Sequence, residues 1–336
     1  MDEPRQLVVT TVDYHTAGEP FRIVTGGVGK IPGGTILEKR RYAVENLDDV
    51  RALLVNEPRG HADMYGCFVT DPVAAGSDLG VLFFHNAGFS TACGHGTIAL
   101  ATYALDAELV PLHAPETELQ IDVPSGTLPV TATVRDGRVQ SVRFRNVPSF
   151  VHEHGIELDT ARGKVTVDVA YGGAFYASVR AEDAGLDVEP GSLPHLIELG
   201  REIKHALESR GEIAHPDEPE LRGVYGVIFY TDEGESPLTQ RNVAVFADGE
   251  VDRSPCGSGT SARLALLHRQ GRLGVGDRLR HRSIVGTEFE AWIVGKAEVA
   301  GRAAVVTDVS GSAHLTGRHE FVVDPDDPLG SGFLLR

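Results

Sequence analysis

Hydrophobic and polar residues alternate along several stretches of the chain, and a period of two predicts strands with one buried face. Gly, Pro and Asp interrupt these stretches, as expected for tight turns, and Asp136-Gly137 predicts a hairpin turn inside one of them. The clearest predicted strands are residues 6–14, 127–147, 163–173 and 302–313.

Helical patterns, in which apolar residues recur every three or four positions, are fewer. They cover residues 96–109, 193–210 and 259–273. The first and the third each follow a glycine-rich turn directly, whereas the second is amphipathic. Many short strands with few helices are typical of the α+β class, and we expect each half of the chain to form a curved, mostly antiparallel sheet around one central helix.

A Cys-Gly-x-Gly-Thr phrase occurs twice, at residues 93–97 and 256–260. Each phrase follows a Tyr-Gly pair and an apolar stretch, with Tyr65 preceding the first cysteine by 28 residues and Tyr225 preceding the second by 31. We interpret this ordered repetition as an internal duplication. It predicts an N-terminal lobe over residues 1–155, completed by the extreme C-terminus, and a C-terminal lobe over residues 156–336.

The net charge and composition of the chain argue against several classes of binding partner. The chain has 336 residues and a formal charge of −17, which argues against binding to nucleic acid or to an anionic membrane. No apolar run is long enough to span a bilayer, and no secretory signal is visible at the N-terminus, so a cytoplasmic location is expected. The three cysteines are too few for a disulfide framework. Neither phrase has metal-ligand spacing, and we expect no metal and no cofactor.

The order strand, glycine-rich turn, helix places Cys93 and Cys256 at helix N-termini. Unpaired N–H groups and the positive end of the helix dipole meet there, so we expect each thiol to have a lowered pKa. The adjacent glycines allow backbone N–H groups to point at an anion such as a substrate carboxylate. Two such thiols on opposite sides of one carbon atom are what a racemase without a cofactor requires, because one removes a proton while the other delivers one.

The chain also resembles a known family. The segments 14–20, 59–66, 91–97, 169–177, 251–260 and 310–317 resemble motifs of the proline racemase family. That family includes proline racemases, hydroxyproline 2-epimerases and trans-3-hydroxy-L-proline dehydratases. The resemblance implies two pseudo-symmetric diaminopimelate-epimerase-like lobes with the active site in the cleft between them.

The resemblance also implies roles for individual residues. Cys93 and Cys256 would be the two acid/base groups. The backbone of Gly94, His95, Gly257 and Ser258 would hold the substrate carboxylate, and the side chains of His95 and Asp252 would contact the ring nitrogen. The expected partner is a small molecule, proline or a hydroxyproline, and a homodimer is left open.

Two features point to different branches of the family. Both cysteines are present, which favours inversion of the α-carbon of proline or 4-hydroxyproline, because dehydratases replace one cysteine by Thr or Ser. Ala174 stands where racemases usually carry Asn, and several flanking motifs resemble the dehydratases. We therefore expect an epimerase or racemase, with trans-3-hydroxy-L-proline dehydratase as the alternative. A non-catalytic amino-acid binding protein and a thiol hydrolase remain rivals, although neither needs two cysteines.

Other conspicuous residues have plainer interpretations. Cys67 lies in a predicted strand without a glycine-rich turn, so we expect a buried structural thiol. Tyr65 and Tyr225 are expected to be core residues of matched strands, and His85 a structural histidine.

Overall fold

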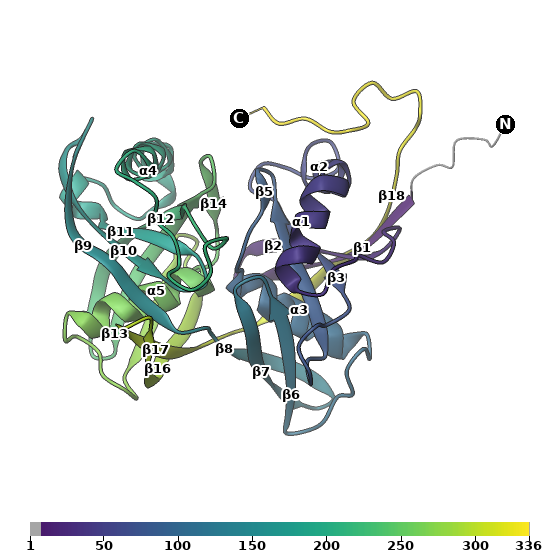
Figure 1. Cartoon of the computed structure of the whole chain (residues 1–336), viewed down its shortest axis with the longest axis horizontal. Coiled ribbons are helices and arrows are strands. Elements are labelled where there is room, and N and C mark those ends of the chain that lie inside the picture. The colour runs from purple at the N-terminus through teal and green to yellow at the C-terminus, as the bar shows by residue number, and fades with distance from the viewer. Residues whose placement is uncertain (1–7, 336) are drawn as a thin grey trace.

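The computed structural model describes residues 8–335 and has two lobes that lie side by side (Figure 1). The chain builds most of the first lobe, passes to the second, and returns along the first near its C-terminus. Residues 6 and 7, part of the strand predicted at 6–14, lie outside the described residues; that strand is β1 from Val8 onward. Among the described residues, no helix is both long and apolar enough to cross a membrane.

Within residues 8–335, the first lobe is built from the eight strands β1 to β8 and from three helices, with β18 added from the end of the chain. Its strands are β1 (Val8–Thr16), β2 (Glu19–Gly26), β3 (Tyr65–Thr70), β4 (Leu79–His85), β5 (Gly88–Phe89), β6 (Glu116–Val123), β7 (Gly126–Arg135) and β8 (Arg138–Arg145). Its helices are α1 (Ile36–Asn46), α2 (Asp48–Val55) and α3 (Gly94–Asp106). Strand β2 pairs with β3 in parallel, β3 pairs with β4 antiparallel, and β4 pairs with β6 in parallel.

The second lobe repeats this order. Its strands are β10 (Gly163–Tyr171), β11 (Phe175–Arg180), β12 (Val224–Glu235), β13 (Leu238–Phe246), β14 (Glu250–Asp252), β15 (Arg278–Ser283), β16 (Glu288–Val299) and β17 (Arg302–Gly311), and its helices are α4 (Leu193–Glu208) and α5 (Gly257–Arg269). Strand β11 pairs with β12 in parallel, β12 with β13 antiparallel, and β13 with β15 in parallel. The pairing of β1 to β8 therefore recurs in β10 to β17, which supports an internal duplication.

Two further strands connect the lobes. Strand β9 (Ser149–Thr160) pairs with β10, and β18 (Ala313–Val322) pairs with β1 in the equivalent position. Strand β17 contacts both β8 and β9, so the sheets of the two lobes form one hydrogen-bonded network. Strand β9 runs without a break through residue 155, and the domain boundary placed there stays a prediction.

The central helices α3 and α5 are almost wholly buried, with eleven of thirteen residues inside in each case. Most of their side chains are small or apolar, and even the polar His95 of α3 and Arg263 of α5 are buried, so each helix is stable only inside the curve of its own sheet. Helix α4 is instead amphipathic and covers the outside of the second lobe with Leu196, Leu199, Ile203 and Leu207. The predicted two-lobed α+β architecture is confirmed, and the predicted helices at 96–109 and 259–273 begin two residues earlier than expected.

Candidate active site

The N-termini of α3 and α5 meet between the two lobes. A methyl group on Gly94 would lie 2.5 Å from the Cα of Gly257, and one on Gly257 would lie 2.8 Å from the Cα of Gly94. Only glycine allows this approach. The first N–H groups of each helix have no acceptor within their own helix, so the junction presents two sets of unpaired donors to one small volume.

Cys93 is the residue that precedes α3, and its backbone is extended. Its sulfur accepts a hydrogen bond from the backbone N–H of Gly96 at 3.2 Å, and it lies 3.4 Å from Nε2 of His95. The thiol is buried, with only 5% of the residue exposed. A cap that accepts from the helix backbone is the arrangement that suits a thiolate.

Cys256 occupies the equivalent position before α5, but its local geometry differs. Its φ of 61° lies in the left-handed region, which a residue other than glycine rarely adopts. The cysteine makes no side-chain cap, and its thiol instead donates to the Tyr176 hydroxyl at 3.6 Å. That hydroxyl in turn contacts the Ser258 hydroxyl at 2.7 Å. The two sulfurs are therefore related by the duplication but not equivalent: Cys93 caps its helix, whereas Cys256 has the Gly259 N–H nearby but donates its own hydrogen bond to Tyr176.

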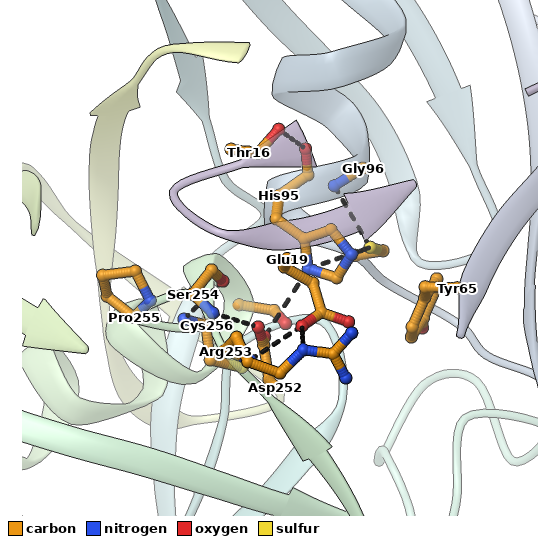
Figure 2. A network of polar contacts seen from close by, with 12 residues as sticks. Thr16, Glu19, Tyr65, His95, Gly96, Asp252, Arg253, Ser254, Pro255 and Cys256 are labelled. Carbon is orange, nitrogen blue, oxygen red and sulfur yellow. Dashed lines mark hydrogen bonds and ion pairs between the residues drawn. The ribbon is translucent and has the colours of Figure 1, made fainter. Parts of the chain in front are cut away.

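Asp252 and His95 join the two lobes beside the sulfurs. His95 Nδ1 lies 3.5 Å from Asp252 Oδ2, and both side chains are buried (Figure 2). The backbone N–H of Ser254 donates to the other carboxylate oxygen at 2.8 Å. Burial opposes ionisation of Asp252, yet His95 and the Ser254 donors lower the pKa of this carboxyl below its ordinary value. The site therefore holds a buried negative charge that can receive a cation.

The pKa values of the two thiols differ from expectation. Burial raises the pKa of both Cys93 and Cys256, and the charge of Asp252 raises it further. The Gly96 and Gly259 N–H groups lower these pKa values only in part. The prediction of lowered pKa values was wrong, because loss of hydration and a nearby carboxylate outweigh the helix ends in the closed cleft. A bound cation beside Asp252 would offset that charge and favour the thiolate.

Several polar residues of the cleft were not identified from the sequence as site residues. Tyr65 and Tyr225 face each other across the lobes, with their hydroxyl oxygens 2.9 Å apart, and the Tyr65 hydroxyl also contacts Ser90. The Tyr65 ring packs edge-on against His95, with ring centroids 4.9 Å apart. The repeated Tyr-Gly pairs were the available signal, but their hydroxyls meet in the cleft rather than serving only the core.

A cavity of about 640 Å³ is lined by both lobes and reaches Ser90 and Tyr225. Its lining includes Arg40 and Ser90 of the first lobe and Ala174, Lys204 and Tyr225 of the second. His85, expected to be structural, also lines it, with Nδ1 2.7 Å from Glu250 Oε2 across the cleft. The volume is ample for a small amino acid, but none of the seven residues predicted to form the site lines this cavity. It is connected to them through Tyr225, whose hydroxyl contacts that of Tyr65.

The seven residues predicted to form the site are brought together. Cys93, Gly94 and His95 lie at the start of α3, and Cys256, Gly257 and Ser258 at the start of α5, while Asp252 ends β14. Their catalytic and binding roles stay predictions. Among residues 8–335, no three His, Cys, Asp or Glu side chains are grouped so that they could hold a metal ion.

The sequence model described as proline racemase matches residues 11–334. The chain belongs to the proline racemase family. Among relatives in this family, a Bacillus cereus protein named trans-3-hydroxy-L-proline dehydratase is 47% identical over 328 residues, which is 98% of each chain. A Burkholderia multivorans protein named 3-hydroxyproline 2-epimerase is 44% identical over 329 residues, again 98% of each chain.

A solved family structure has the same fold. The hydroxyproline epimerase from Agrobacterium vitis, crystallised with bound trans-4-hydroxy-L-proline, superimposes with a TM-score of 0.93. It is 34% identical, and the alignment covers 99% of this chain and 96% of that one. The predicted fold class, two diaminopimelate-epimerase-like lobes, is confirmed. The chain is an enzyme of the proline racemase family, whose relatives here carry both epimerase and dehydratase names.

Proposed function

We propose that this enzyme is a cofactor-independent epimerase or racemase that inverts the α-carbon of proline or a hydroxyproline. The observation that carries the proposal is the pair of buried thiols, Cys93 and Cys256, at two helix starts that abut through Gly94 and Gly257. Inversion needs one group to remove a proton from one face and a second to supply a proton to the other. Neither a binding protein nor a thiol hydrolase has a use for the second thiol.

In this mechanism the substrate carboxylate binds the free N–H groups of Gly94, His95, Gly257 and Ser258. These donors, with the positive ends of both helix dipoles, stabilise the charge that develops on the carboxylate as the α-proton leaves. The ring ammonium binds the Asp252 carboxylate beside His95. Its positive charge offsets the carboxylate that raises both thiol pKa values, so substrate binding favours formation of a thiolate.

The asymmetry of the two sulfurs suggests their starting roles. Cys93 accepts the Gly96 N–H and is suited to be the thiolate, whereas Cys256 donates to Tyr176 and is suited to be the thiol. The Cys93 thiolate takes the α-proton, and the electron pair of the C–H bond passes into the carboxylate. The Cys256 thiol then gives its proton to the opposite face of the carbon. No proton is lost overall, and the cysteines exchange protonation states.

Dehydration of trans-3-hydroxy-L-proline is the second candidate. It shares the first proton transfer, after which the 3-hydroxyl takes a proton from one of the two thiols and leaves as water, and the resulting enamine tautomerises to pyrroline-2-carboxylate. The dehydratase name of a 47% identical relative and Ala174 in the cavity lining both favour it. The hydroxyls of Tyr65, Ser90 and Tyr225 would offer polar partners to a hydroxyl on the ring.

An NMR time course in D₂O separates the candidates. L-Proline, trans-4-hydroxy-L-proline and trans-3-hydroxy-L-proline are incubated separately with the enzyme. We expect the opposite C2 isomer to appear with deuterium at C2 for at least one of them. Rapid formation of pyrroline-2-carboxylate from the 3-hydroxy substrate, without inversion or labelled product from any of the three, would contradict the proposal in favour of the dehydratase.

A further inference from the structure

Strand β14 of the second lobe carries Asp252 and is held by the first lobe on both sides of this residue. The backbone N–H of Val251 donates to Asp63 Oδ1 at 3.1 Å. The backbone N–H of Arg253 donates to Glu19 Oε2 at 2.7 Å. Two carboxylates of one lobe therefore accept hydrogen bonds from the backbone N–H groups of the two residues next to Asp252 of the other.

The Arg253 side chain completes this contact. Its Nε lies 3.1 Å from Glu19 Oε2, and its Nη1 donates to the Asp63 backbone carbonyl at 3.1 Å and lies 3.6 Å from Asp63 Oδ2. One guanidinium thus bridges both carboxylates, and Figure 2 shows Arg253 and Glu19 lying against each other next to Asp252. An ionised partner makes such hydrogen bonds shorter and stronger than neutral ones.

Burial of the Glu19 carboxylate costs free energy, because the carboxylate loses its hydration. The Glu19 side chain is completely buried, and its Oε1 atom has no hydrogen-bond partner among the described residues. Burial raises the pKa of Glu19 well above its ordinary value, although Arg253 opposes this effect. An apolar residue would be cheaper for packing alone. An acceptor is useful at this position because Glu19 accepts a hydrogen bond from the Arg253 N–H, which belongs to the peptide group that follows Asp252.

We propose that Glu19 and Asp63 are positioning residues that hold the Asp252 carboxylate at the ring nitrogen of the substrate when the two lobes are closed. This inference rests on the proposed function, in which Asp252 binds that nitrogen. Because both acceptors belong to the first lobe, these contacts with β14 form only where the two lobes meet. The placement of the Asp252 carboxylate therefore depends on how the lobes pack against each other.

Two flat ligands test the role of the ring nitrogen. Pyrrole-2-carboxylate has a ring N–H that can donate to Asp252, whereas furan-2-carboxylate presents a ring oxygen there. In the unmodified enzyme the pyrrole should bind about ten- to a hundredfold more tightly, the usual effect of one hydrogen bond to a charged group. Titration calorimetry of both ligands gives this affinity ratio without any need for turnover.

Glu19→Leu removes the acceptor, and Glu19→Gln keeps one. We expect Glu19→Leu to lower the ratio of the pyrrole-2-carboxylate affinity to the furan-2-carboxylate affinity severalfold, while the furan-2-carboxylate affinity changes little. Glu19→Gln should retain most of this affinity ratio. Adding Glu19→Leu to Asp252→Ala should lower it no further, because both changes act through one contact. Arg41→Gln is the matched control: it breaks a lobe-crossing ion pair with Glu220, far along the chain from β14, and should leave the ratio unchanged.

Hydrogen exchange tests these contacts without a ligand. Glu19→Leu should speed exchange of the Arg253 amide, and Asp63→Ala that of the Val251 amide, whereas Arg41→Gln should affect neither. If Glu19→Leu does not fold, Asp63→Ala still tests the proposal, since Asp63 is partly exposed.

Each outcome bears on a different claim. An equal loss of affinity for both ligands would show that these contacts only close the cleft, and the positioning role would be wrong. Unchanged amide exchange at Arg253 and Val251 would also overturn it. If the unmodified enzyme binds neither ligand, the proposed function falls, and with it the role of Asp252 at a ring nitrogen.

Discussion

Gly94 and Gly257 touch across the two lobes, closely enough that a methyl group on Gly94 would lie 2.5 Å from the Cα of its counterpart. Each residue is the first of a buried helix and follows a cysteine. The contact fixes the distance between the two helix starts, and therefore the space available between the two sulfurs. It also explains why the duplicated phrase keeps a glycine directly after each cysteine.

Replacing Gly94 or Gly257 by alanine should push the helix starts apart. The added methyl group meets backbone atoms, which cannot move aside, so we expect a loss of stability of about 1–3 kcal/mol and a much larger loss of activity. Thermal unfolding and steady-state kinetics measure both. Gly29→Ala is the control, because a methyl group there meets nothing within 4 Å. Near-normal activity of Gly94→Ala would show that the helix starts tolerate separation.

Cys93→Ser and Cys256→Ser should each abolish inversion, because a serine hydroxyl is a far weaker acid than a thiol. Retained inversion in either variant, followed by circular dichroism of the substrate, would rule out the two-thiol mechanism. Cys67→Ala serves as control. Cys67 lies on β3 and is completely buried, so its replacement should lower stability but leave inversion intact.

Cys256→Thr should change the reaction from inversion of the α-carbon to dehydration, rather than only stop inversion. A threonine hydroxyl reprotonates the carbanion poorly, so a 3-hydroxyl has time to leave. We expect this variant to lose inversion and to retain or gain formation of pyrroline-2-carboxylate from trans-3-hydroxy-L-proline, followed with an imine reductase assay. A variant that still inverts the α-carbon would show that Cys256 is not the second acid.

Alkylation by iodoacetamide should be slow at neutral pH and should accelerate as the pH rises. The thiolate is the reactive form, and burial together with Asp252 raises the pKa of both cysteines, so the thiolate fraction at pH 7 is below that of a free cysteine. Mass spectrometry of Cys93 and Cys256 after timed reaction between pH 7 and pH 10 measures the rates. A rate that already reaches its plateau at pH 7 would mean that the pKa values are lowered instead. Pyrrole-2-carboxylate should protect both sulfurs.

The sequence by itself determined the two-lobed fold and the residues that gather at its centre. A repeated phrase needs no long-range information to be recognised, and the order strand, turn, helix is set by local patterns of apolar residues and glycine. Two matched halves that bury matched helices pack most simply around a pseudo-twofold axis. For this reason the repeat alone predicts that Cys93 and Cys256 lie together, whereas Asp252 is predicted only through the resemblance to the proline racemase family.

Only the tertiary structure decided the electrostatics and the supporting contacts. A helix start lowers a thiol pKa locally, but how much water the thiol loses and which carboxylate it faces depend on how the lobes close. The same is true of Tyr65 and Tyr225, which are 160 residues apart and share a hydrogen bond across the cleft. Glu19 likewise meets Arg253 only through closure. A repeated Tyr-Gly pair marks the two tyrosines as related, but neither this pattern nor any local one says that their hydroxyls meet or that Glu19 faces Arg253, because these contacts form only when the two lobes pack together.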